Sequence, residues 1–154
     1  MSDDRSDMAR AGSDSLDAKI CFDIYATNLA FARFYSVWLE PHGLTYPNYL
    51  VLTLLWERDG QSLGEIGAAL SLKSNTLTPL VKRMEAAGLL VRERSSVDER
   101  QVMLKLTTKG KALQTTLADL PACTVAATGQ SHETLRALQL QLRQIRAHLG
   151  REPR

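Results

Sequence analysis

The two cysteines, Cys21 and Cys123, are the strongest nucleophiles in this chain. They are too few to form a disulfide scaffold. In a reducing compartment such thiols are either inert, packed as small apolar side chains, or redox-active. No metal or cofactor site is expected, because no Cys or His pair has ligand spacing and His42, His132 and His148 are scattered. From the residues alone, Cys21 is either a buried apolar residue or a reactive thiol.

A second group of polar residues is expected to share one face of a short helix that follows Lys73. Short hydrogen-bonding groups come first and cations follow, which suits a helix that reads base edges and binds phosphates. Pro79 lies near the start of this helix, so it removes about one backbone hydrogen bond without breaking the middle. The alternative is a solvated polar face. The group comprises Lys73, Ser74, Asn75, Thr76, Thr78, Pro79, Lys82 and Arg83.

The elements around this face distinguish the two interpretations. Ser62 and Glu65 have the spacing of a capping box, which predicts a helix start, and a tight turn at 71–73 leads to the next helix. Gly88 is expected to end that second helix. Strand-like segments at 89–94 and 101–106 flank a polar loop, so a hairpin should follow, with Arg94, Ser95, Asp98 and Arg100 near its tip. Residues 62–109 are therefore predicted to form a winged helix-turn-helix module.

The charge distribution agrees with a double-stranded DNA partner. Residues 62–110 hold eight Lys and Arg against five Asp and Glu, whereas residues 1–40 hold four cations against seven acids. The net charge of +2 alone would not indicate nucleic acid, but the basic excess lies in the predicted module.

Long amphipathic helices are expected on both sides of the module. One should span 15–40, a second apolar helix 46–57, and a third should begin at Thr107 and be kinked or ended by Pro121. The last, over 131–149, has apolar residues in 3-4-3-4 alternation. We predict a disordered tail at 1–13, a single domain at 14–154, and a homodimer built from residues 15–40 and 107–149. No apolar run is long enough to cross a membrane and the N-terminus lacks a signal-peptide pattern, which predicts a cytoplasmic protein.

The motif Asp98-x-Arg100 followed by Leu106-Thr107-x-x-Gly110, on a helix-rich winged helix, resembles the MarR family of bacterial regulators. The segments 39–57, 77–89 and 98–107 are similar to its OhrR-like members, the organic hydroperoxide-sensing repressors. The resemblance implies a MarR-like dimer, mainly α with a β-hairpin wing, that is not an enzyme. Such a repressor binds a pseudo-palindromic operator and releases it when an organic hydroperoxide, the inducer, oxidises a cysteine. Lys73 and Asn75 depart from the pattern of the family, so the operator sequence does not follow.

The resemblance also assigns roles to the thiols and to three tyrosines. Cys21 matches the sensing thiol, and Cys123 matches the second thiol of the two-cysteine type, which bridges the subunits. Tyr25 lies one turn after Cys21 on the same face, whereas Tyr35 lies about 21 Å along the helix and would reach only the partner subunit's thiol. Tyr46 matches the third tyrosine of the site. The helix dipole should help little, because Cys21 would lie more than one turn inside the helix.

Other interpretations of these residues remain open. The tyrosines would equally suit packing at an interface, and Cys123 would suit a core position. A MarR-type repressor released by a small phenolic or apolar ligand would make both cysteines incidental. A thiol peroxidase using Cys21 is the alternative from another class, and the basic module argues against it. In the DNA-binding interpretation, Arg100 enters the minor groove and Asp98 orients it.

Overall fold

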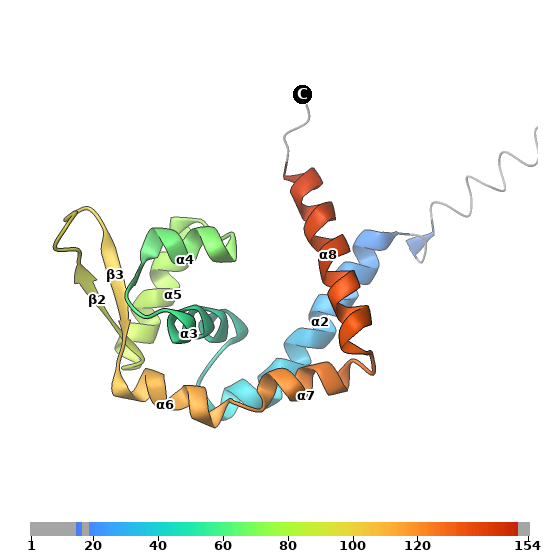
Figure 1. Ribbon diagram of the computed structural model, residues 1–154, viewed down its shortest axis with the longest axis horizontal. Coiled ribbons are helices and arrows are strands. Elements are labelled where there is room, and N and C mark those ends of the chain that lie inside the picture. The colour runs from blue at the N-terminus through green and yellow to red at the C-terminus, as the bar shows by residue number, and fades with distance from the viewer. Residues whose placement is uncertain (1–14, 17–18, 151–154) are drawn as a thin grey trace, which may run out of the picture. The chain divides into compact units, whose positions relative to one another are not determined.

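Helices make up most of the structure, and one small antiparallel sheet accompanies them (Figure 1). The computed structural model describes residues 15–16 and 19–150, so the tail predicted at 1–13 lies outside the described residues. This architecture confirms the predicted class, mainly α with a β-hairpin wing. The elements are α2 (Ile20–Leu39), η2 (Glu40–His42), α3 (Tyr46–Glu57), β1 (Gln61–Ser62), α4 (Leu63–Leu70), α5 (Ser74–Ala86), β2 (Leu90–Arg94), β3 (Val102–Leu106), α6 (Thr108–Thr116), α7 (Leu120–Ala127) and α8 (His132–Leu149).

Two compact units, Met1–Gln114 and Thr115–Arg154, divide the chain. The first contains α2, α3 and the winged helix, and the second contains α7 and α8. The prediction of a single domain at 14–154 stays a prediction. No helix within the described ranges is long and apolar enough to cross a membrane.

The helix-turn-helix forms as its sequence predicts. The Ser62 hydroxyl accepts from the Glu65 N–H and the Glu65 carboxylate accepts from the Ser62 N–H, which closes the capping box at the start of α4. Ser71 ends α4 in the left-handed conformation (φ 55°), and the Leu72 N–H donates to the Gly67 carbonyl. A Cβ on Gly67 would lie 3.0 Å from the Leu72 carbonyl oxygen, so glycine permits this tight corner.

Helix α5 packs its apolar face inward. Leu77, Leu80, Val81 and Met84 are buried, as their 3-4 spacing predicts. The helix ends at Ala86, and Gly88 follows its C-cap with a φ of 72°, which allows the Leu89 N–H to return to the Met84 carbonyl. The predicted glycine stop is therefore confirmed, and it directs the chain from α5 straight into the wing.

The sheet has three strands in the order β1-β3-β2, all antiparallel. Strands β2 and β3 form the predicted hairpin, with Leu90 opposite Leu106 and Arg94 opposite Val102. The sequence did not reveal β1, because two residues, Gln61 and Ser62, are too few to show an alternating pattern. Leu104 is fully buried on β3, so one face of the wing belongs to the core.

Helix α2 begins later than predicted. The predicted helix starts at residue 15, but Lys19 has an extended backbone (φ −97°, ψ 103°) and α2 starts at Ile20. Cys21 is consequently in the first turn of the helix and not beyond it. The expectation that Cys21 lies more than one turn inside the helix is wrong for this reason.

The C-terminal helices also differ at one boundary. Thr107 caps α6 as expected, accepting from the Gly110 N–H at 3.1 Å. Helix α6 ends at Thr116, however, and Pro121 lies in the first turn of α7, where its missing N–H is no loss. The prediction that Pro121 kinks or ends the earlier helix is wrong. Ser131 caps α8, and Leu138, Leu142 and Ile145 along its apolar seam are 40–48% exposed in the isolated chain.

Candidate DNA interface and thiol site

The predicted recognition residues share the exposed side of α5. Lys73 is the N-cap residue, although its side chain makes no cap hydrogen bond, and the polar residues after it are exposed except Thr78, which is half-buried. Lys82 extends the exposed polar side further along the helix. Pro79 is accommodated within α5, which continues to Ala86. The arrangement leaves one face of α5 free for base edges and phosphates, while the opposite face is buried.

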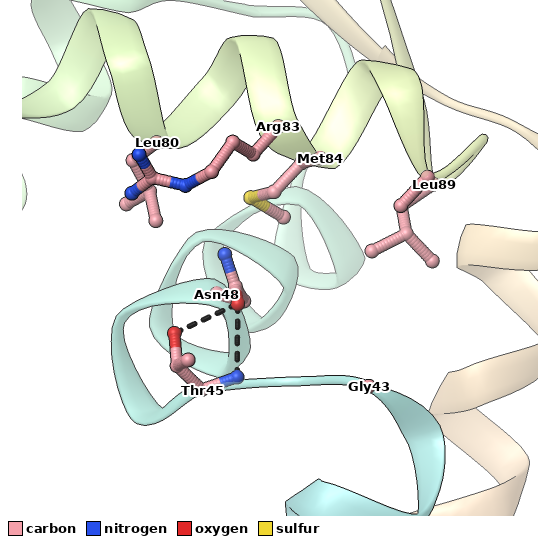
Figure 2. Close-up of a pocket in the computed structure, with 8 residues that line it drawn as sticks. Gly43, Thr45, Asn48, Leu80, Arg83, Met84 and Leu89 are labelled. Atoms are coloured by element: carbon pink, nitrogen blue, oxygen red, sulfur yellow. Dashed lines mark hydrogen bonds between the residues drawn. The ribbon is translucent and has the colours of Figure 1, made fainter.

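Arg83 lies apart from this set. It lines a cavity of about 210 Å³ together with Thr45 and Asn48 of the α3 N-terminus and apolar side chains of α5 (Figure 2). Asn48 accepts from both the backbone N–H and the hydroxyl of Thr45, at 2.8 and 2.7 Å, and so caps α3. Arg83 therefore sits beside the positive end of α3, a position that favours anions.

The wing tip is held by local hydrogen bonds. The Ser95 hydroxyl accepts from the backbone N–H groups of Val97 and Asp98, and the Asp98 carboxylate accepts from the Arg100 N–H at 3.1 Å. The Arg100 guanidinium remains 3.9 Å from Asp98 and its side chain is 96% exposed. The predicted pairing of Asp98 with Arg100 thus appears mainly in the backbone of the loop, and it leaves the guanidinium free to reach outward.

Four of the eight cations of the module make contacts within it. Arg100 lies 3.9 Å from Asp98 and Lys109 donates to the Ala87 carbonyl at 2.8 Å, while the other two form short ion pairs. Arg92 pairs with Glu85 at 2.7 Å and Lys105 pairs with Glu93 at 2.6 Å. These contacts lower the pKa of Glu85 and raise the pKa of Lys105, chiefly through the side-chain hydrogen bonds. No ion pair among the described residues engages Lys73, Lys82 or Arg94. The positive charge available to a partner is therefore concentrated on α5 and the wing tip.

Cys21 is exposed in the first turn of α2, and Tyr25 lies one turn further on. The first turn of a helix carries unpaired N–H groups and a partial positive charge, which favour a negative group. Helix α2 runs without interruption to Leu39, so Tyr35 lies about 21 Å from Cys21 along the same axis. Cys123 lies in α7, half-buried, in the other unit.

Tyr35 and Tyr46 belong to one aromatic cluster. Their ring centroids are 4.5 Å apart, and Tyr49 lies 5.8 Å from Tyr35 and 6.4 Å from Tyr46. Burial, followed by the neighbouring Tyr35, raises the pKa of both Tyr46 and Tyr49. The structure brings two of the three predicted tyrosines together and leaves Tyr25 elsewhere on α2.

Two members of this region were not foreseen as site residues. Tyr49 follows Tyr46 by three positions on α3, a spacing that places both on one face and that the sequence displays. Trp56 contacts Tyr49 edge-on, with ring centroids 6.0 Å apart, and donates from Nε1 to the Gly110 carbonyl at 2.9 Å. The sequence does not predict the hydrogen bond between Trp56 and Gly110, because it joins residues 54 positions apart.

The family model described as transcriptional regulator SarA/Rot matches residues 33–117, more than half of the chain. The HTH-type transcriptional regulator TtmR of Methylorubrum extorquens is 46% identical over 148 residues, which cover 94% of this chain and 76% of that protein. The organic hydroperoxide resistance transcriptional regulator of Bacillus subtilis is 40% identical over 124 residues, covering 80% and 84%.

Solved structures of AbfR from Staphylococcus epidermidis are also similar. Reduced AbfR bound to DNA has a TM-score of 0.75 and 35% identity, covering 97% of this chain and 99% of that one. The disulfide-formed structure has a TM-score of 0.59 and 34% identity, covering 94% and 98%. With its winged helix, the exposed face of α5 and these relatives, the chain belongs to the SarA/Rot family of MarR-like transcriptional regulators, and its resemblance to the OhrR-like members is confirmed.

Proposed function

We propose that the protein is a homodimeric, redox-sensing repressor that binds a pseudo-palindromic operator when reduced and releases it when an organic hydroperoxide oxidises Cys21. The observation that carries this proposal is the position of Cys21, exposed in the first turn of α2 with Tyr25 one turn away. A peroxide can reach such an exposed thiol, and the thiolate of a cysteine is the form that attacks a peroxide O–O bond. Two relatives support the same chemistry: the organic hydroperoxide resistance regulator, and AbfR, whose structures are solved in reduced and disulfide forms.

The sensing site requires two subunits in this proposal. Tyr35 and Tyr46 lie about four helical turns from the Cys21 of their own chain, so they would complete the site around the Cys21 of the other subunit. Their hydroxyls would donate hydrogen bonds to the thiolate and to the departing oxygen. A tyrosine hydroxyl keeps its proton at neutral pH, and burial raises the pKa of Tyr46 further, so it can act as a donor.

The chemical steps balance with one hydroperoxide per site. The Cys21 thiolate attacks the terminal peroxide oxygen, the O–O bond breaks, and the alkoxide takes a proton and leaves as an alcohol. Cys21 becomes a sulfenic acid. The Cys123 thiol of the other subunit then attacks that sulfur, water leaves, and a disulfide forms. Two thiols are oxidised and one hydroperoxide is reduced, and a thiol reductant restores the starting state.

The geometry of the disulfide explains how oxidation would release the DNA. A disulfide requires its two Cα atoms within about 7 Å, so closing the bridge constrains the segments that carry Cys21 and Cys123. In a two-fold dimer the two α5 helices must match half-sites about one turn of DNA apart. A change in their spacing breaks contacts on at least one half-site, and the loss of a few kcal/mol is enough for release.

We assign the DNA contacts to the exposed face of α5 and to the wing. Lys73, Asn75 and Thr76 are placed for base edges, Lys82 for phosphate, and Arg100 for the minor groove. Arg83 is assigned to phosphate beside the N-terminus of α3. The remaining members of the proposed interface are Ser74, Thr78, Pro79, Arg94, Ser95 and Asp98.

The mass of the protein under non-reducing, denaturing conditions tests the redox proposal, before and after one equivalent of cumene hydroperoxide. The expected result is a covalent dimer that dithiothreitol reverses and that neither Cys21→Ser nor Cys123→Ser forms. A monomer that gains a single oxygen would keep Cys21 as the sensor and remove Cys123 from the mechanism. No change in mass would overturn the redox proposal and leave a repressor released by a small apolar ligand.

A further inference from the structure

Helix α3 meets the tyrosine cluster at one end and the base of the wing at the other. Tyr46 is its first residue and Trp56 its last but one. Between them, Val51, Leu52 and Leu55 are buried, so α3 is anchored along its length and should move as one body. An element of this kind transmits a displacement from one end to the other only if both ends are attached to their neighbours.

At the cluster end the attachment is aromatic. Tyr35 of α2 contacts Tyr46 and Tyr49, and Tyr49 contacts the ring of Trp56 edge-on at 6.0 Å. The rings form a continuous series from α2 to the C-terminal end of α3. A displacement of Tyr35 or Tyr46 can therefore reach Trp56 through rings that contact one another.

At the wing end the attachment is a hydrogen bond to a fixed backbone. Trp56 Nε1 donates to the Gly110 carbonyl at 2.9 Å. Gly110 lies so close to Leu89 that a Cβ there would collide with the Leu89 carbonyl oxygen. That same oxygen accepts from the Thr107 N–H, and the Thr107 hydroxyl donates to the Gly88 carbonyl at 2.6 Å. Gly110 is thus tied to the junction where α5 ends and β2 begins.

A second contact fastens the same end of α3 to the other wing strand. The Asp59 carboxylate, two residues after α3, accepts from the backbone N–H of Leu106, the last residue of β3, at 2.9 Å. Both wing strands are therefore held at their base by the C-terminal end of α3. Of the two residues that make these attachments, Trp56 and Asp59, Trp56 also contacts the tyrosine cluster, through Tyr49.

We infer that Trp56 is a positioning residue that couples the state of the tyrosine cluster to the placement of the wing and of α5. The inference rests on the redox-sensing function proposed above. Oxidation of a Cys21 that the cluster contacts would shift the tyrosine rings, and Trp56 carries that shift to Gly110 and hence to the α5–β2 junction. Trp56 does not touch the thiol, so its effect is on DNA release and not on the oxidation step.

The variant Trp56→Phe tests this role, because it keeps an aromatic ring against Tyr49 and removes the donor to Gly110. The probe is a duplex selected by the reduced wild-type protein from a randomised library, and cumene hydroperoxide is the oxidant. We expect Cys21 to oxidise at the wild-type rate and reduced protein to bind DNA within about threefold of wild type. The ratio of the Kd of oxidised protein to the Kd of reduced protein should be about fivefold or more smaller in Trp56→Phe than in wild type. This factor corresponds to the free energy of about one hydrogen bond. Trp38→Phe, the same change at the other tryptophan, should leave all three quantities unchanged.

The outcomes separate this inference from the proposed function. If oxidised wild-type protein keeps its DNA affinity, the redox function fails whatever Trp56 does. If wild type releases DNA and Trp56→Phe releases it by the same factor, the coupling role is wrong and the redox function stands. Should Trp56→Phe not fold, fluorescence replaces it, since Trp38→Phe leaves Trp56 as the sole tryptophan. Its emission should shift on oxidation, and an unchanged spectrum would overturn the inference.

Discussion

Lys73 occupies a position where its residue type is unfavourable to the fold. As the N-cap of α5 it offers no acceptor to the first turn, and it places a cation at the positive end of the helix. Replacement by a capping serine would be better for stability alone. A residue that weakens its own helix and is exposed on the recognition face is consistent with selection for binding.

We predict that Lys73→Ser raises the free energy of unfolding by about 1 kcal/mol and weakens DNA binding. Urea denaturation measures the free energy of unfolding. DNA titrations at several salt concentrations measure the binding, and the slope of log Kd against log salt concentration (the salt slope) should fall by about one. Lys19→Ser is the control, because Lys19 is also the N-cap of a helix, α2, but lies outside the proposed interface. It should leave the salt slope unchanged. An unchanged DNA affinity in Lys73→Ser would remove Lys73 from the interface.

The cations of the module differ in their availability, and this distinction is also testable. Lys82→Ala should reduce the salt slope by about one ion, because one phosphate contact is lost on any sequence. Arg92→Ala should leave that slope unchanged, because Arg92 is paired with Glu85 at 2.7 Å. The measurement is a DNA titration at several salt concentrations. Equal slopes for the two variants would contradict the assignment of Lys82 to phosphate.

At the scale of elements, the Leu-Thr-x-x-Gly motif has a steric explanation. Gly110 is the only residue of its helix that must lack a Cβ, because the Leu89 carbonyl occupies that space. We predict that Gly110→Ala lowers the free energy of unfolding by about 2 kcal/mol or more, since backbone and not a flexible side chain must move. Gly64→Ala in α4 is the control, because its Cβ would meet only Ser62 Oγ at 3.9 Å, an ordinary contact. Thermal unfolding of both variants distinguishes them, and Gly64→Ala should be neutral or stabilising.

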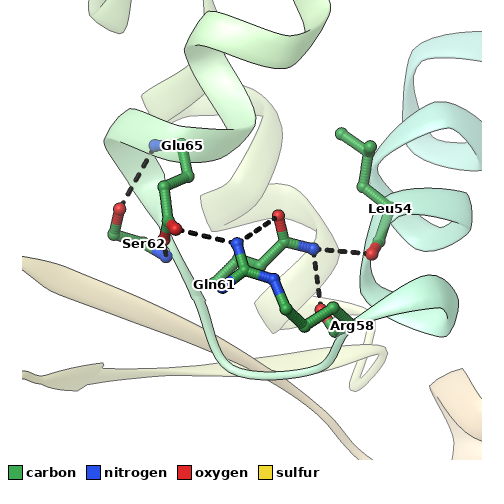
Figure 3. Close-up of polar contacts among 5 residues, drawn as sticks. All are labelled: Leu54, Arg58, Gln61, Ser62 and Glu65. Atoms are coloured by element: carbon green, nitrogen blue, oxygen red, sulfur yellow. Dashed lines mark hydrogen bonds and ion pairs between the residues drawn. The ribbon is translucent and has the colours of Figure 1, made fainter.

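The start of α4 carries a pH-dependent interaction. Arg58 donates to Glu65 at 2.8 Å, and the capping N–H of Ser62 adds to it, so the pKa of Glu65 falls to about 2 (Figure 3). Because the folded-state pKa lies below the usual 4.5, this stabilisation is present above pH 4.5 and is lost as the pH falls towards 2.

Glu65→Gln should therefore lower Tm at pH 7, and its difference from wild type should shrink as the pH falls from 4.5 to about 2. Glutamine keeps an acceptor for the capping box, so the charge alone is tested. Calorimetry across this range provides the measurement. Glu133→Gln, in the first turn of α8, is the control and should show a smaller change at pH 7. A Tm difference for Glu65→Gln that stays constant down to pH 2 would contradict the assignment.

Element boundaries were predictable where a single residue enforces them. Ser62, Gly88 and Thr107 act through local hydrogen bonds or a positive φ, and each boundary formed as expected. The start of α2 was not predictable, because the extended backbone of Lys19 interrupts a pattern that remains apolar on both sides. Strand β1 depends on pairing with β3 about 40 residues away, which no local pattern reports.

The residues of the candidate site also divide into those that local sequence predicts and those that depend on tertiary contacts. The exposed face of α5 could be derived from periodicity, because the buried residues Leu77, Leu80, Val81 and Met84 define its opposite. The Trp56–Gly110 bond and the Arg92–Glu85 pair could not, since both depend on the tertiary fold. Sequence reasoning thus counted Arg92 and Lys105 as available charge, whereas the structure engages both in ion pairs.

At the scale of the whole molecule, α8 presents an apolar seam that the isolated chain leaves exposed. Leu138, Leu142 and Ile145 lie on one side of the helix, and no residue of α8 is buried. We predict that Leu142→Asp converts the proposed dimer to monomer at micromolar concentration, as measured by light scattering after size exclusion. Leu140→Asp is the control, because Leu140 is 59% exposed on the opposite side of α8. A Leu142→Asp protein that remains dimeric would exclude this seam from the interface.

The uninterrupted course of α2 has a genetic consequence. With Cys21 and Tyr35 about four turns apart on one rod, no single polypeptide carries a whole sensor in the proposed arrangement. Two defective alleles, one lacking the thiol and the other lacking the hydroxyls of Tyr35 and Tyr46, should then complement each other. Their mixed dimer contains one intact site, formed by the thiol of one product and the tyrosines of the other. Cells carrying both alleles should form the disulfide-linked covalent dimer on peroxide treatment, whereas cells carrying either allele alone should not.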